Sequence, residues 1–184
     1  MKLGHPEDPD QTTILEYSSG SDLVRSIISE SAQLRMGDGI TSIEGETLPS
    51  VLLPLDPKSI ARVWLPGDLP NPVEMERAID LIEGAIMDAR IAHANRGVLV
   101  TSSAVLRKIP GLDSNNATLT RDEIEEKFNR LAMAAHGQRS ALGDLPQDPE
   151  VAAALIILRE SMHHLGFDEI RAADLLIKSN RKAS

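Results

Sequence analysis

Residues 148–166, DPEVAAALIILRESMHHLG, decide the fold that the sequence predicts. Asp148 is placed to cap the amino end of a helix, Pro149 occupies its first position, and Gly166 is placed to end it. The side chains in the first half of this helix are apolar on nearly every side for two turns. A helix of this kind is typical of a protein interior, so the stretch predicts a helix in the middle of the molecule.

Two other long helices are predicted before this central one. One follows Asn71, which has capping-box spacing with Glu74, and it is expected to reach Gly97. The other follows Thr120, which has the same spacing with Glu123, and its apolar residues share one face. Shorter helices are expected over residues 21–37, 102–109 and 168–178.

The first 70 residues differ in composition from the rest of the chain. They contain five Lys or Arg against eleven Asp or Glu, so they carry −6 of the total charge of −9. Three short runs within them contain β-branched residues and are broken by Gly and Pro, which predicts two or three small strands. These runs are residues 40–45, 50–55 and 61–67.

These patterns together predict a mainly α protein. We expect a helical bundle of three long and two or three short helices, carrying a small β-containing N-terminal unit. The change of composition places the boundary near residue 70. Residues 1–70 would form the acidic, proline-rich unit with one helix and short strands, and residues 71–184 the helical bundle domain.

Composition excludes or disfavours several classes of protein. There is no cysteine, which excludes disulfides and thiolate metal sites. A net charge of −9, with only two Phe, one Tyr and one Trp, disfavours a nucleic acid partner.

The longest apolar run, residues 151–158, is far shorter than the roughly 20 residues that cross a bilayer. No apolar run near the amino end resembles a signal peptide, so we expect no membrane contact and a cytoplasmic location.

Glu160, His163 and His164 form the first candidate site, which is a metal site. On a helix Glu160 lies between the two histidines, and all three side chains project within about 100° of one another. This spacing permits coordination of one ion. On this interpretation the cofactor is a divalent metal; the alternative is that the protein has no cofactor. The residues on other helices that can supply further ligands are Asp80, Glu83, Asp88, His93 and His136.

The same stretch also has a purely structural interpretation. Histidines are favoured near the carboxyl end of a helix, where unpaired carbonyl groups carry partial negative charge. Gly166 would then adopt the left-handed conformation that ends the helix, and Phe167 would pack back on the last turn. On this interpretation the protein needs no cofactor.

A second candidate site resembles a helix-turn-helix, with Gly97 in the turn. The residues that would contact base edges or phosphates are Thr101, Ser102, Ser103, Arg107 and Lys108. Ser103 falls where an apolar residue is usual, and Pro110 limits the helix to about two turns. The alternative is a connector helix that packs on the bundle.

Trp64 has two interpretations, the plug of the small β unit or an anchor in an interface. Three classes of function stay open. The first is a non-enzymatic protein-binding or assembly protein that self-associates as a homo-oligomer. The second is a metal-binding helical-bundle enzyme that uses Glu160, His163 and His164, and the third is a helix-turn-helix DNA-binding regulator. The absence of catalytic motifs favours the first and argues against an enzyme.

Overall fold

The computed structural model describes residues 31–46, 48–91, 94 and 96–173. The strands are β1 (Ser31–Gly37), β2 (Ile40–Gly45), β3 (Val51–Leu53), β4 (Val98–Thr101), β5 (Thr118–Thr120) and β6 (Glu169–Ala172). The helices are α2 (Pro57–Trp64), α3 (Pro72–Asp88), α4 (Arg121–Ala135) and α5 (Pro149–Leu165), with short 3₁₀ turns η1 (Leu106–Lys108) and η2 (Arg139–Leu142).

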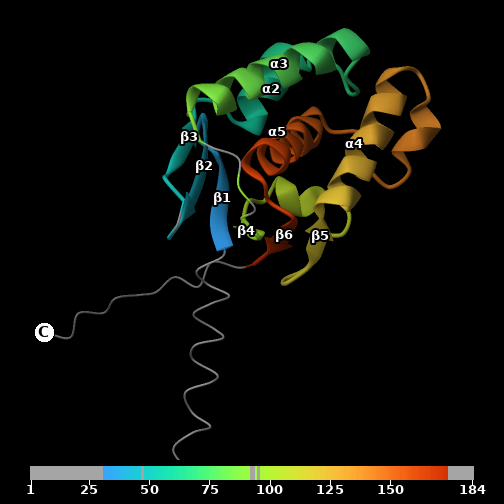
Figure 1. Cartoon of the computed structure of the whole chain (residues 1–184). Helices are drawn as coiled ribbons and strands as arrows, with labels where there is room; N and C mark the ends of the chain where they lie inside the picture. The colour runs from blue at the N-terminus through green and yellow to red at the C-terminus, as the bar shows by residue number, and fades with distance from the viewer. Residues whose placement is uncertain (1–30, 47, 92–93, 95, 174–184) are drawn as a thin grey trace, which may run out of the picture.

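All six strands form one mixed sheet in the order β3-β2-β1-β4-β6-β5. Strands β1, β4 and β6 are parallel neighbours, whereas β2 and β3 continue antiparallel from β1, and β5 pairs antiparallel with β6. Parallel crossovers are almost always right-handed, and the two crossovers from β1 to β4 to β6 step in the same direction across the sheet. They therefore place their helices on the same face, as Figure 1 shows.

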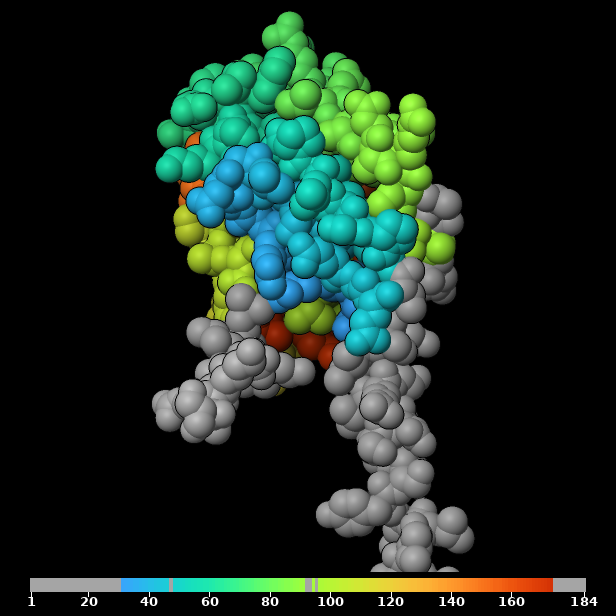
Figure 2. Space-filling view, turned by 90° about the vertical axis from the view of Figure 1, so that its left-hand side faces the viewer, coloured from blue at the N-terminus to red at the C-terminus, as the bar shows by residue number. Residues whose placement is uncertain are grey.

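The strands follow a period of two in burial, which fits a sheet covered on one face. In β4 and β6 alternate residues are buried and partly buried, and in β1 Ala32 and Leu34 are buried while Arg35 is exposed. Figure 2 shows the β1–β3 part of the molecule, blue to cyan, at the surface below α2 and α3. The structure is therefore built of a sheet layer and a helix layer, with the core between them.

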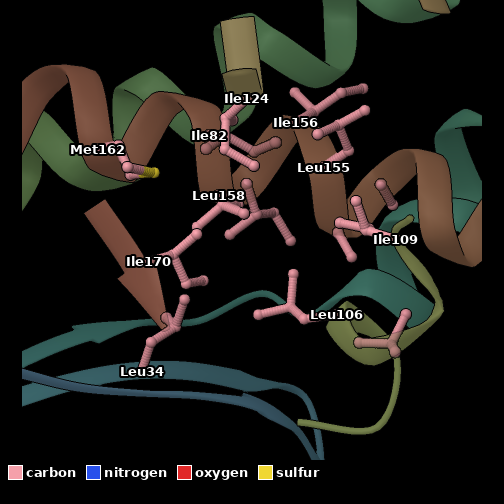
Figure 3. Close-up of a cluster of buried hydrophobic side chains, with 14 of the residues drawn as sticks. Leu34, Ile82, Leu106, Ile109, Ile124, Leu155, Ile156, Leu158, Met162 and Ile170 are labelled. Atoms are coloured by element: carbon pink, nitrogen blue, oxygen red, sulfur yellow. The ribbon is translucent and has the colours of Figure 1, made fainter. Parts of the chain in front are cut away.

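Helix α5 lies at the centre of this core, as its sequence predicted. It contacts α2, α3, α4 and η1. Figure 3 shows its residues Leu155, Ile156 and Leu158 among side chains from the sheet and from other helices. Its ends are also as predicted: Asp148 accepts hydrogen bonds from the first turn, and Gly166 is left-handed with φ of 81°. Phe167 is fully buried behind this cap.

The prediction of a mainly α helical bundle is wrong. Residues 31–37 form strand β1, where the end of a helix was expected, and residues 169–172 form β6 inside another expected helix. Both segments contain good helix formers, but each has a neighbouring strand to pair with and an alternating apolar face to bury, and tertiary pairing overrides local propensity. The predicted boundary near residue 70 falls between α2 and α3, and strands from both sides of it belong to one sheet.

The other predicted strands and helices agree with the structure in part. The strand expected over residues 40–45 is β2, and the one expected over 50–55 contains β3. The strand expected over 61–67 is wrong, because α2 extends to Trp64. Helix α3 begins directly after Asn71, which forms the predicted capping box with Glu74, but it ends at Asp88 instead of Gly97. Residues 21–30 of the helix expected over residues 21–37 lie outside the described residues. No helix within the described ranges has the length and hydrophobicity needed to span a bilayer.

Candidate functional site

The carboxyl ends of the parallel strands β1 and β4 meet at one edge of the sheet. The backbone N–H of Met36, near the end of β1, donates to the Ser103 hydroxyl oxygen at 3.0 Å. Thr101 ends β4; its hydroxyl donates to the carbonyl of Leu34 at 3.0 Å and accepts from the N–H of Ser103 at 3.1 Å. The loop that follows β4 is thereby held against the end of β1.

The turn between β1 and β2 lies at the same edge. Gly37 pairs with Ile40, so the turn consists of Asp38 and Gly39 alone. Both have positive φ, 56° and 80°, which is the geometry of a type I′ hairpin turn and the reason for the Asp-Gly sequence. This turn and residues 101–103 are called the sheet-edge site below.

Asp56 fixes this turn to the start of α2. One carboxylate oxygen accepts from the N–H of Gly39 at 3.0 Å, and the other accepts from the N–H of Ser59 at 2.8 Å, which caps the helix. Burial alone would raise the pKa of Asp56, but the hydrogen bonds from Ser59 and Gly39, with the nearby charge of Lys58, lower it below its usual value. Asp56 is therefore ionised at neutral pH and stabilises both elements.

Replacing Asp56 with alanine is expected to lower the free energy of unfolding by about 1 to 2 kcal/mol at pH 7. Because folding lowers the pKa of Asp56, its contribution is present above about pH 4 and is lost as the pH falls through the pKa in the folded protein. Urea unfolding at pH 7 and pH 3 should thus show a smaller difference at pH 3. Asp68→Ala, in an exposed loop, is the control, and equal losses in both variants would contradict the assignment.

The residues assigned to nucleic acid recognition do not form a recognition helix. Thr101 ends strand β4, the segment after it is a turn, and only Leu106–Lys108 is helical, as a single 3₁₀ turn. Lys108 forms a salt bridge of 3.0 Å with Asp148 at the start of α5. The helix-turn-helix prediction is wrong because Val98–Thr101 pairs with β1 and β6 in the middle of the sheet.

The structure brings together two of the three predicted metal ligands and adds a carboxylate from another helix. His164 Nε2 lies 3.4 Å from Glu160 Oε2 and 3.4 Å from Glu83 Oε1 on α3. Glu160 is completely buried, whereas His164 is partly exposed. The exposed ring of His163 meets that of His164 edge-on, with centroids 5.1 Å apart, but His163 is outside the set of converging donors. Glu83 was one of several carboxylates that the sequence offered as partners.

Trp64 is the last residue of α2 and packs, partly buried, against the hydrophobic core. Its role in an interface stays a prediction.

Comparisons with known proteins show which solved structures have a similar fold. No family model matches the chain. No curated protein matches it either. Solved structures do match. The crystal structure of the Ppx/GppA family member of Aquifex aeolicus is 14% identical, with a TM-score of 0.59, over 78% of this chain and 52% of that one. An exopolyphosphatase-like protein is 13% identical, with a TM-score of 0.59, over 79% of this chain and 56% of that one.

The shared property is the fold. The chain spans about half the length of the solved structures that it matches. The prediction of a non-enzymatic protein-binding or assembly protein was made from the absence of catalytic motifs and from the expected amphipathic helices, and it is overturned by the mixed-sheet fold, which is similar to that of Ppx/GppA enzymes. The metal-binding bundle enzyme and the DNA-binding regulator are wrong as functions for the same reason.

Proposed function

We propose that this chain is a phosphate-binding lobe of a phosphatase-type enzyme, and that a phosphate ester or anhydride binds at the sheet-edge site. The observation that carries the proposal is the hydrogen bond from Met36 to Ser103, because it holds a hydroxyl-bearing loop beside the β1–β2 turn. In open α/β sheets, ligands bind beyond the carboxyl ends of the strands where the strand order reverses, and here that point is between β1 and β4. The likeness in fold to Ppx/GppA enzymes supports the substrate class.

Three side chains at this edge have chemistry suited to binding a phosphate group and to its hydrolysis. The Ser103 hydroxyl accepts from Met36 and keeps its own hydrogen for donation to a phosphate oxygen. Lys58, exposed in the first turn of α2, supplies positive charge to an otherwise acidic edge. Asp38 supplies a carboxylate that accepts a proton from water as the water attacks phosphorus and the bond to the leaving group breaks.

The proposal is tested by binding of tripolyphosphate in the presence of Mg²⁺, measured by calorimetry. Ser103→Ala and Lys58→Ala should each weaken binding by about tenfold or more, because a hydrogen bond to a charged group contributes about 1.5 to 3 kcal/mol. Ser140→Ala, at an exposed position in η2, and Lys127→Ala, on α4, are matched controls that should bind as the wild type does. Failure of the wild type to bind tripolyphosphate at millimolar concentration would overturn the proposal.

A cytoplasmic location is part of this proposal and is tested by cell fractionation. Self-association stays a prediction, which light scattering tests.

A further inference from the structure

Three potential metal ligands converge between two helices that lie side by side. Glu83 comes from α3, and Glu160 and His164 come from successive turns of α5 (α3 and α5 are seen in Figure 1). One donor atom from each lies within 4.8 Å of the other two. These residues are called the three-donor cluster below, and they lie on the helix layer, away from the residues of the sheet-edge site.

The buried carboxylate of the cluster has an oxygen without a hydrogen-bond partner. Glu160 is 0% exposed, and its Oε1 accepts from Arg159 at 2.7 Å. Its Oε2 is buried and has no hydrogen-bond partner among the described residues, although it faces His164 Nε2 at 3.4 Å. Leaving a charged oxygen buried and unpaired is costly, so this atom indicates a missing partner.

The charge around the cluster indicates a cation. Arg159 donates from Nε to both oxygens of Glu125 on α4, at 3.0 and 3.1 Å, and so is shared between Glu125 and Glu160. Together with Glu83, which contacts His164, these residues contain three carboxylates and one guanidinium, which gives them a net charge of −2 when the imidazole is neutral. A divalent cation would neutralise this charge.

The distances within the cluster fit a small metal ion. Ligand atoms at about 2.0 to 2.1 Å from a tetrahedral zinc ion lie about 3.3 Å from one another. His164 Nε2 is 3.4 Å from both carboxylate oxygens, so two of the three separations already have this value. An imidazole together with carboxylates selects a transition metal over Mg²⁺ or Ca²⁺, which prefer oxygen ligands alone.

We propose that Glu83, Glu160 and His164 bind one divalent transition metal ion, best matched by Zn²⁺, which joins α3 to α5. A pocket beside His164 gives the ion a path from solvent and room for water as a fourth ligand; it is lined by Ile86, Met87, Arg90, Ile91, Arg121 and His163. Arg121 in this pocket is paired with Asp168 at 3.2 Å. The proposal does not depend on the function proposed for the sheet-edge site.

The test is titration of the metal-free chain with Zn²⁺, followed by calorimetry and by the unfolding temperature. The wild type should bind one equivalent and unfold at a higher temperature when the ion is bound. His164→Ala and Glu83→Gln should weaken binding by at least about tenfold, a loss that even indirect partners of metal ligands cause. Both residues contact solvent, so both variants should fold, and circular dichroism checks this.

The neighbouring residues supply matched controls. His163→Ala removes an adjacent exposed imidazole, and Glu76→Gln removes an exposed carboxylate from the same helix as Glu83; both variants should bind Zn²⁺ as the wild type does. Absence of binding in the wild type, or a loss caused by His163→Ala and not by His164→Ala, would overturn the proposal. Tripolyphosphate binding should be unchanged in His164→Ala, so the two proposals can fail separately.

Discussion

Replacing Leu158 with alanine is expected to lower the free energy of unfolding by about 2 to 5 kcal/mol. Leu158 is completely buried in the central helix α5. In Figure 3 its side chain lies between Ile82 of α3 and the strand residue Ile170. Truncation removes apolar contacts and leaves a cavity, and the sheet on one side and the outer helices on the other limit how far the site can collapse.

The measurement is urea unfolding of both proteins, followed by circular dichroism. Met133→Ala on α4 is the control, because Met133 is 45% exposed and its removal should change stability by less than about 0.5 kcal/mol. A loss of less than about 1 kcal/mol for Leu158→Ala would contradict the central position of α5, because it would place this side chain where solvent or mobile neighbours can fill the space.

The elements that the sequence predicted correctly are those whose signals are local. Helix α5 has a capping Asp148, Pro149 at the first position and the left-handed Gly166, all within one stretch of chain. Helix α4 likewise begins at a capping box formed by Thr120 and Glu123. Such signals depend on hydrogen bonds between near neighbours, so the sequence contains them in full.

Strands β2 and β3 were predicted, but β1, β4 and β6 were missed because they pair with strands that are distant in the chain. Strand β1 pairs with β4, more than 60 residues later, and β4 pairs with β6. A run of four residues such as Glu169–Ala172 is too short to distinguish a strand from a helical turn by its period. One local signal was available for β1, because Asp38 and Gly39 between alternating residues favour a tight hairpin, and this signal would have indicated that β1 pairs with the predicted strand β2.

Prediction of the candidate sites from the sequence was limited by the same dependence on contacts between distant parts of the chain. The sequence placed Glu160 and His164 on one helix face, since their spacing is fixed by the helix itself. It could not select Glu83 from the other acidic residues, because the choice depends on how α3 packs against α5. Ser103 was noticed for its hydroxyl, but its position beside Met36 follows from strand pairing that the sequence did not predict.

Replacing Arg159 with methionine in the metal-free protein is expected to lower the free energy of unfolding by about 3 to 5 kcal/mol. Glu160 is fully buried, and the 2.7 Å hydrogen bond from Arg159 is the only one that its carboxylate accepts within the described residues. Methionine keeps most of the packing of the long side chain but leaves the carboxylate uncompensated. The desolvation of an unpaired charge then opposes folding.

The measurement is urea unfolding at pH 7 with a chelator present, so that no cation compensates Glu160. Arg171→Met is the matched control, because Arg171 pairs with Glu169 at 3.0 Å in a partly exposed position, and such pairs contribute about 0 to 1 kcal/mol. The double variant Arg159→Met with Glu160→Leu removes both charges and should recover most of the loss, because a buried ion pair can often be exchanged for apolar side chains of similar volume. If the double variant were no more stable than Arg159→Met alone, the loss would come from the contacts of Arg159 with Glu125 and the Phe128 ring, and the buried carboxylate would not be its cause.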